Sequence, residues 1–257
     1  MERRSIGVDN APILFLEKGA RMKAVGGKAI YGAAVGILML DARFPRIPGD
    51  MGNATTWPFP VHFKIVRGAS PDQVVRKAAD GLLTTFIDAA KELVAEGVDG
   101  ITTNCGFLSL FQDELAAAVQ VPVATSSLMQ VGLVNATLPP GQRAGILTIS
   151  GSSLTKAHLQ AADVPEGTPI GTTEGGREFT EAILGNALKL DVEAARRDNV
   201  EAAAELLTAN PEIGALVLEC TNMTPYAAEI REVVGCPVFT AESFVSWFHS
   251  GLVPRRY

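Results

Sequence analysis

The sequence of 257 residues contains little charge, little histidine and little cysteine. Charged residues make up 19% of it and aromatic residues 6%, and there are three histidines and three cysteines. Lysine and arginine form no basic block, and the formal net charge is −6. Nucleic acids and anionic membrane surfaces are bound through clustered basic side chains, so the composition argues against both as partners.

Long apolar runs are also missing, since none approaches the roughly 18 residues that a membrane span needs. Near the N-terminus, Glu17, Lys18 and Arg21 interrupt the apolar residues, and we expect neither a signal peptide nor a membrane anchor. A chain with three cysteines and no export signal is expected in the cytoplasm, with reduced thiols rather than disulfides.

Motifs for the familiar cofactors do not occur. The sequence has no G-x-x-x-x-G-K-[ST] loop, no G-x-G-x-x-G after a strand-like run, and no lysine in a recognisable cofactor motif. His62, His158 and His249 share no ligand spacing with the cysteines described below. We therefore expect no zinc site and no other metal site.

An internal repeat is the most informative feature that is present. One apolar run of strand character ends in Cys105, and a second run, 115 positions later (220 − 105), ends in Cys220. A proline follows each cysteine after the same 17 positions, at Pro122 (122 − 105) and Pro237 (237 − 220). Between these points one apolar helix face recurs at equal offsets, which indicates two related halves.

The repeat extends upstream, where residues 36–41 have a counterpart in residues 145–150. Strand-like and helical segments alternate in both halves, which predicts an α/β fold with parallel sheets. We assign residues 1–124 together with 241–257 to an N-terminal α/β lobe, and residues 125–240 to a C-terminal α/β lobe.

Three connecting segments complete the predicted organisation. Residues 42–60 are rich in proline, glycine and aromatic side chains, which favours a long but ordered lid loop. Ser70 followed by Pro71 is typical of a helix start, and helical spacing continues to Gly97. Residues 126–140 are interpreted as the crossing from the first half to the second.

The position of the two cysteines suggests chemistry. Ligands of parallel α/β sheets bind beyond the carboxyl ends of the strands, where Cys105 and Cys220 are predicted to lie. Each also precedes a helix, whose N-terminus is expected to lower the thiol pKa. Two such thiols on opposite sides of one carbon could remove and return a proton. Cys236 lies beside a strand start and is interpreted as a small buried hydrophobe.

These motifs resemble those of the aspartate/glutamate/hydantoin racemase superfamily from about residue 36 onward. The resemblance rests on residues 36–41, 102–106, 145–153 and 219–222. It implies two α/β lobes related by a pseudo-twofold axis, an active site in the cleft between them, and a reaction without pyridoxal phosphate or metal. In that reaction one cysteine takes a proton beside a carboxylate and the other protonates the opposite face.

By this resemblance Cys105 and Cys220 are the catalytic acid–base pair. The residues expected to contact the substrate are Asp41, Arg43, Asn104, Gly106, Ser150, Ser152, Thr221 and Asn222. Two of these depart from the pattern of amino-acid racemases. Asn104 precedes the first cysteine instead of following it, and Asn222 replaces the usual histidine or glutamate, as in maleate isomerases and arylmalonate decarboxylases.

The predicted function is racemisation or epimerisation of a small carboxylate, with aspartate or glutamate as expected substrates and no cofactor. One alternative is a cis–trans isomerase or decarboxylase of a small dicarboxylate that uses an active-site cysteine. Another is a small-molecule binding protein without catalysis. The sequence leaves the oligomeric state open, a homo-oligomer included.

Overall fold

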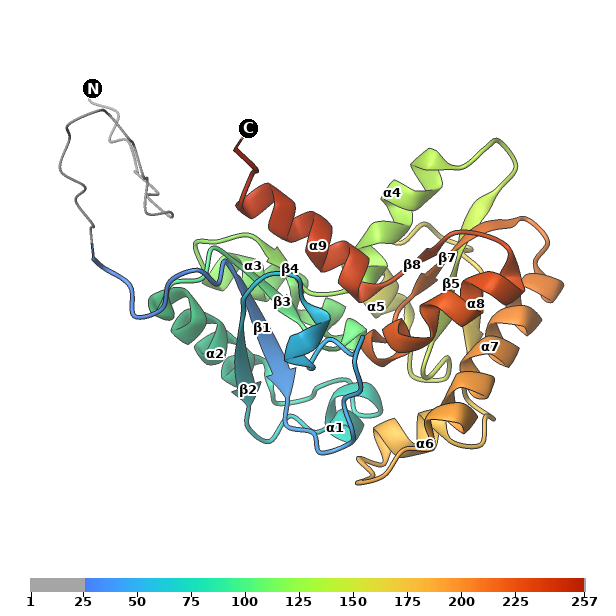
Figure 1. Ribbon diagram of the computed structural model, residues 1–257, viewed down its shortest axis with the longest axis horizontal. Coiled ribbons are helices and arrows are strands. Elements are labelled where there is room, and N and C mark those ends of the chain that lie inside the picture. The colour runs from blue at the N-terminus through green and yellow to red at the C-terminus, as the bar shows by residue number, and fades with distance from the viewer. Residues whose placement is uncertain (1–25, 257) are drawn as a thin grey trace.

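The computed structural model describes residues 26–256, which form two parallel sheets of four strands each (Figure 1). The first sheet has the order β2-β1-β3-β4 and the second has the order β6-β5-β7-β8. The strands are β1 Val35–Leu40, β2 Val61–Val66, β3 Gly100–Thr103, β4 Val123–Ala124, β5 Arg143–Thr148, β6 Ile170–Thr172, β7 Ile213–Leu218 and β8 Val238–Phe239.

Helices connect and flank the strands. The α-helices are α1 Pro71–Val75, α2 Leu83–Glu96, α3 Gln112–Ala118, α4 Gln130–Thr137, α5 Lys156–Ala161, α6 Phe179–Leu184, α7 Val192–Ala209, α8 Ala227–Val234 and α9 Ala241–Leu252. The 3-10 helices are η1 Ala54–Thr56, η2 Gly106–Phe111, η3 Ser127–Met129 and η4 Thr221–Tyr226. The predicted fold class, two related lobes with helix-flanked parallel sheets, is confirmed.

The repeat seen in the sequence is a repeat of structure. The succession β3-η2-α3-β4 in the first lobe matches β7-η4-α8-β8 in the second, and β1 and β5 hold equivalent places in the two sheets. Because the strands are parallel, β1 and β3 end at the same edge of their sheet, and so do β5 and β7. Each lobe therefore presents the carboxyl end of a central strand next to a 3-10 helix.

Strand β1 is buried on both faces, as its unbroken apolar sequence indicates. Leu38 and Leu40 belong to the large core that includes residues of α2. Ile37 and Met39 belong to a smaller core that also holds Val245 of α9. The alternation follows from the two-residue period of a strand.

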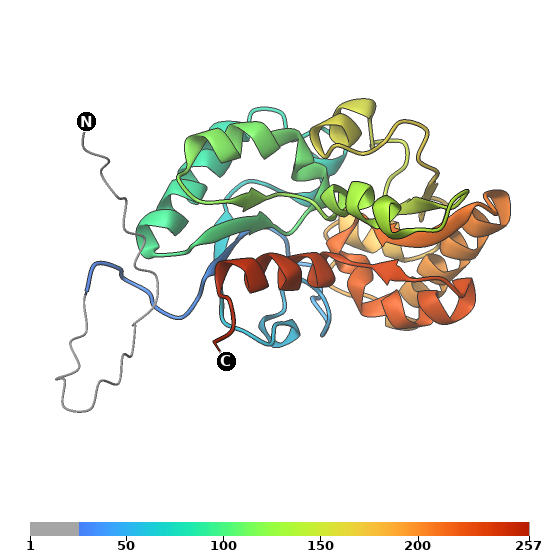
Figure 2. The ribbon, with the colours of Figure 1, turned by 90° about the horizontal axis from the view of Figure 1, so that it is seen from above.

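The two lobes exchange a covering helix. Helix α4 follows the last strand of the first sheet but packs on β5 and β7 of the second. Helix α9 follows the last strand of the second sheet and packs on β1 and β3 of the first (Figure 2). This exchange ties the lobes together, while the boundaries that we predicted between them stay a prediction.

Two sequence expectations need correction. Ser70 does cap a helix, accepting a hydrogen bond from the Gln73 amide, but α1 ends at Val75 instead of running to Gly97. Ala78 and Ala79 adopt positive φ angles of 52° and 55°, which no helix tolerates, and α2 begins only after that turn. The segment 126–140, which we expected to be a plain crossing, contains η3 and α4.

The long segment 42–60 is ordered, as predicted. Asn53 accepts a hydrogen bond from the Thr55 amide and caps η1. The Trp57 indole donates to the Met51 carbonyl at 3.1 Å, and both side chains are buried. Backbone groups of this long loop thus find hydrogen-bond partners inside the loop itself.

Candidate active site

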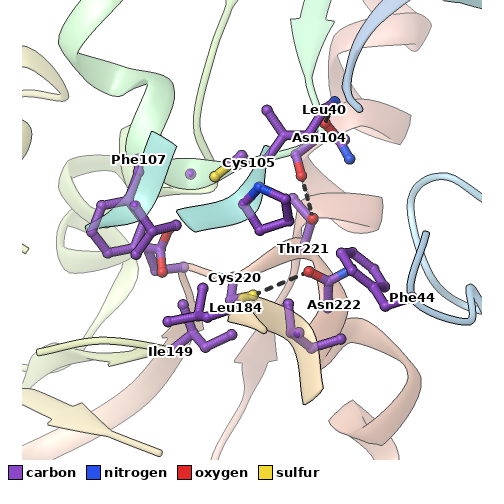
Figure 3. A pocket seen from close by; sticks show the side chains of 15 residues that line it. Leu40, Phe44, Asn104, Cys105, Phe107, Ile149, Leu184, Cys220, Thr221 and Asn222 are labelled. Carbon is purple, nitrogen blue, oxygen red and sulfur yellow. Dashed lines mark hydrogen bonds between the residues drawn. The ribbon is translucent and has the colours of Figure 1, made fainter. Parts of the chain in front are cut away.

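Cys105 and Cys220 occupy equivalent positions at the carboxyl ends of β3 and β7 and line the same cavity (Figure 3). Cys105 comes directly before η2 and Cys220 directly before η4. The cavity lies between the two lobes, since residues of both lobes line it. Its apolar wall is made by Leu40, Phe44, Pro71, Val75, Phe107, Ile149, Ile183 and Leu184.

The structure gathers six of the ten predicted site residues at this cavity. They are the two cysteines with Asn104, Gly106, Thr221 and Asn222. A hydrogen bond from the Thr221 hydroxyl to the Asn104 carbonyl, at 2.7 Å, joins the two strand ends (Figure 3). The two cysteine motifs are therefore in direct contact although 115 positions separate their cysteines (220 − 105).

The other four predicted residues do not line the cavity. Asp41 pairs with Arg67 on the surface, at 3.4 Å. The backbone amide of Arg43 donates to Asn186 of the second lobe.

Ser150 and Ser152 lie in the turn after β5, and both hydroxyls donate to the Glu174 carboxylate, at 2.7 and 2.5 Å. That turn is thus held by a neighbouring loop and does not face the cavity.

The expectation that the helix N-termini lower the thiol pKa values is wrong for this structure. Burial and, to a smaller extent, the neighbouring Glu219 carboxylate raise the pKa of Cys105 to about 12, against backbone N–H groups of Phe107 and Leu108 that lower it. Burial and Glu219 also raise the pKa of Cys220 well above its usual value. The desolvation of a buried thiolate outweighs the few N–H dipoles that a short 3-10 helix provides.

The two thiols differ in their partners. Cys220 Sγ donates to Asn222 Oδ1 at 3.5 Å, and the Asn222 amide nitrogen in turn donates to Asp50. Asp50, 3% exposed, is paired with Arg46 at 2.9 Å. Cys220 therefore sits in a hydrogen-bonded chain as a proton donor. Backbone N–H groups favour both thiolates, two of them (Phe107 and Leu108) at Cys105 and one (Asn222) at Cys220.

Glu219 is a site residue that we did not predict. It directly precedes Cys220, lines the cavity and is fully buried. The Thr148 hydroxyl donates to its Oε2 at 2.7 Å, and burial raises the pKa of the carboxyl to about 7. One signal could have revealed it, because Glu219 is a charged residue at the end of a run of six apolar or glycine residues, Ile213–Leu218.

No family model matches the sequence. Among solved structures, unliganded arylmalonate decarboxylase superposes with a TM-score of 0.51 at 14% identity, covering 88% of this chain and 94% of that one. An aspartate racemase homologue from Pyrococcus horikoshii OT3 superposes with a TM-score of 0.52 at 18% identity. The superposition covers 85% of this chain and 98% of that one. Allantoin racemase from Pseudomonas fluorescens superposes with a TM-score of 0.54 at 15% identity, over 85% of this chain and 90% of that one.

The chain has the fold of the Asp/Glu racemase superfamily. The predicted resemblance is thereby confirmed. Two curated proteins are similar to this chain in sequence. Dimethylsulfoniopropionate lyase from Durusdinium sp. clade D is 28% identical over 231 residues, which are 87% of this chain and 76% of that protein. Dimethylsulfoniopropionate lyase 7 from Emiliania huxleyi strain CCMP1516 is 29% identical over 239 residues, which cover 86% of this chain and 67% of that protein.

The 42–60 loop bridges the two lobes beside the cavity. Gly49, at a φ of 95°, lies so close to η4 that an added Cβ would stand 3.0 Å from the Pro225 Cα. Asp50 follows it and reaches Asn222, as described above. The first-lobe loop therefore positions the residue that contacts the second cysteine, while its role as a lid stays a prediction.

Within residues 26–256, no three histidine, cysteine, aspartate or glutamate side chains are grouped so that they could hold a metal ion. In the same part of the chain, no helix has the length and apolar character required to cross a membrane.

Proposed function

We propose that this protein is a lyase that removes a proton from the carbon beside a carboxylate and eliminates a sulfonium group from the next carbon. Its expected substrate is dimethylsulfoniopropionate or a close analogue. The observation that carries the proposal is the pair of cysteine thiols, one from each lobe, in a single largely apolar cavity. The sequence relatives named as lyases support elimination as the outcome of that proton transfer.

Cys105 is the proposed base. Two backbone N–H groups, those of Phe107 and Leu108, favour its thiolate, whereas Cys220 receives one, from Asn222, and is also engaged as a donor to the Asn222 side chain. The Cys105 thiolate takes the α-proton, and the C–H electron pair forms the Cα–Cβ double bond. The Cβ–S bond breaks with its electrons going to sulfur. The products are neutral dimethyl sulfide and acrylate, and Cys105 then loses its new proton to solvent.

The dry cavity suits this charge balance. Proton transfer and elimination remove one negative charge, on the thiolate, and one positive charge, on the sulfonium. A low-dielectric site favours a step in which opposite charges disappear together. The pKa of about 12 makes the Cys105 thiolate a strong base once formed, and a bound cation would lower that pKa by direct attraction.

Racemisation or epimerisation is the second candidate. It is favoured by the Cys220 thiol, which lines the same cavity and is held as a proton donor through its bond to Asn222. A racemase needs such a donor to protonate the face opposite the base, whereas an elimination does not. Aspartate and glutamate are the substrates that this candidate predicts.

The test is a substrate panel followed by proton NMR in deuterium oxide. Purified protein with dimethylsulfoniopropionate is expected to release dimethyl sulfide and acrylate. Cys105→Ala should slow this release about 10³-fold, since a general base contributes 10²- to 10⁴-fold. Cys236→Ala, outside the cavity lining, should not change it.

Loss of the α-proton signal of aspartate or glutamate, without dimethyl sulfide release, would replace the lyase proposal by the racemase. Turnover that survives in both single cysteine variants would refute cysteine acid–base chemistry altogether.

A further inference from the structure

The carboxylate of Glu219 is a buried charge with one side left unpaired. Thr148 and the Ile149 backbone amide donate hydrogen bonds to it, with Thr148 bound to Oε2. Its Oε1 is fully buried and, within the described part of the chain, has no hydrogen-bond partner. A buried acceptor without a donor costs about 1–3 kcal/mol, so a native protein seldom keeps one without a reason.

The unpaired oxygen lies against the backbone that carries the first cysteine. A Cβ built on Gly106 would stand 2.2 Å from Glu219 Oε1. The absence of a side chain at position 106 therefore makes the room that this carboxylate occupies. Glu219 belongs to the second lobe and Gly106 to the first, so the carboxylate of one lobe packs directly against the backbone of the other.

When Glu219 is ionised, which requires a pH near or above its pKa of about 7, the cavity holds a negative charge that no lining residue offsets. Glu219 is the one carboxylate among the fifteen residues that line it, and none of those fifteen is lysine, arginine or histidine. Arg46 is paired with Asp50 at 2.9 Å and does not line the cavity.

Phe44 and Phe107 add two aromatic rings to the wall, and the faces of such rings attract cations. The Arg46 guanidinium already lies over one face of Phe44, 4.6 Å from the ring centroid, so a ligand cation has the other face of Phe44 and the Phe107 ring to contact. The chemistry of the wall thus fits a positively charged, weakly hydrated group.

We propose that Glu219 is the subsite for the onium group of the substrate, so that the cavity selects carboxylates that also bear a sulfonium or quaternary ammonium. This inference deepens the proposed function and rests on it for the presence of a substrate carboxylate. The onium group has no N–H to donate. It is bound by charge attraction to Glu219 Oε1 and by contact with the aromatic rings, which in a desolvated site are both stronger than in water.

Binding a cation there also assists the first cysteine. Glu219 raises the pKa of Cys105 by repulsion between two negative charges. An onium group beside the carboxylate offsets that repulsion, and the thiolate forms more readily. The substrate would therefore favour formation of its own base, and a neutral carboxylate of the same shape would not.

The test compares two ligands of matched shape by isothermal titration calorimetry. One is 3-(trimethylammonio)propionate, a permanent cation, and the other is 4,4-dimethylpentanoate, in which carbon replaces nitrogen. Wild-type protein is expected to bind the ammonium ligand about 10- to 100-fold more tightly, the range of a hydrogen bond or contact that involves a charged group. Glu219→Gln keeps the shape and the Thr148 contact, and should abolish that preference.

Glu174→Gln is the matched control, because this carboxylate is bound by Ser150 and Ser152 and does not line the cavity. It should keep the wild-type preference. Equal binding of the two ligands to wild-type protein, tighter binding of the neutral one, or binding of neither would each overturn the proposal, and these results need no variant that folds. An unchanged preference in Glu219→Gln would overturn it as well.

The outcomes separate this inference from the proposed function. Cation preference without release of dimethyl sulfide keeps the onium subsite and rejects the lyase reaction. Release of dimethyl sulfide, with the same KM in Glu219→Gln as in wild type, keeps the lyase reaction and rejects the subsite.

Discussion

The two strand ends that carry the cysteines are copies of each other, yet the residue before each cysteine has a different task. In the first lobe it is Asn104, whose side-chain oxygen accepts a hydrogen bond from the Leu40 amide at 2.7 Å. In the second lobe it is Glu219, one of whose oxygens stays unpaired at the cavity. The Asn104 side chain bonds to the end of the neighbouring strand β1, whereas the Glu219 carboxylate keeps one oxygen that the proposed ligand would bind.

The residue after each cysteine differs in a complementary way. Thr221 reaches from the second lobe to the carbonyl of Asn104, and Gly106 makes room in the first lobe for Glu219. Each difference in one half thus fits a difference in the other. Duplication placed two thiols together, and the unequal neighbours make the site directional, with a base on one side and a donor on the other.

Replacing each cysteine separately tests whether Cys105 acts as the base and Cys220 as the donor. Of the changes considered, Cys105→Ala has the largest expected effect on the rate. For elimination, Cys105→Ala should lower kcat about 10³-fold and Cys220→Ala less than about tenfold, because only the base acts in the rate-determining bond cleavage. Initial rates of dimethyl sulfide release measure both. Equal losses in the two variants would mean that the thiols act symmetrically, as in a racemase.

The bond between Asp50 and Asn222 has no counterpart in the other half, and Asp50→Ala would break it. This change leaves the Arg46 charge without its partner at a site where Asp50 is 3% exposed. We expect the free energy of unfolding, measured in urea, to fall by about 3 kcal/mol. Asp41→Ala is the control. It removes a surface pair with Arg67 and should cost less than about 1 kcal/mol. Similar losses in the two variants would contradict the structural importance of the buried pair.

The unpaired Glu219 should make stability depend on pH, whereas Asn104 at the equivalent position cannot. Its pKa is raised to about 7 in the folded protein from a usual value of 4.5. The contribution of Glu219 to the free energy of unfolding is fully present below pH 4.5 and is lost as the pH rises through 7. The loss amounts to roughly 3 kcal/mol.

His158 has the opposite effect, because burial lowers its pKa to about 4 and stability is then lost as pH falls. Urea unfolding of wild type and Glu219→Gln between pH 5 and 8 isolates the carboxyl. A constant difference between the two proteins across that range would show that Glu219 does not titrate as described.

Adding a methyl group to the first half, as Gly106→Ala, should have a smaller effect. The new Cβ would meet Glu219 Oε1 and the Glu219 carbonyl, so we expect a loss of about 1–3 kcal/mol from overpacking. At the equivalent position, Thr221→Ala removes only the hydrogen bond to Asn104, with a loss of about 1 kcal/mol. Thermal unfolding compares the stability of the two variants. A larger loss of stability in Thr221→Ala than in Gly106→Ala would contradict this prediction.

The residues that were read correctly from the sequence lie where local signals suffice. Ser70 followed by Pro71 caps a helix as predicted, and the cysteine motifs lie at strand ends. The break at Ala78 was missed because alanine favours helix, and nothing in the local sequence reports its positive φ. Asp50 was missed because its partner Asn222 lies far along the chain.

The sequence by itself determined the two-lobed parallel α/β architecture and the position of one cysteine in each lobe. Apolar periodicity and an internal repeat are local patterns, and they specify strands, helices and their order. Only the tertiary structure decided that Glu219 packs against Gly106 of the other lobe, that Asp50 reaches Asn222, and that the thiol pKa values rise. Burial and contacts between distant segments set these properties, because both depend on how the two lobes pack against each other.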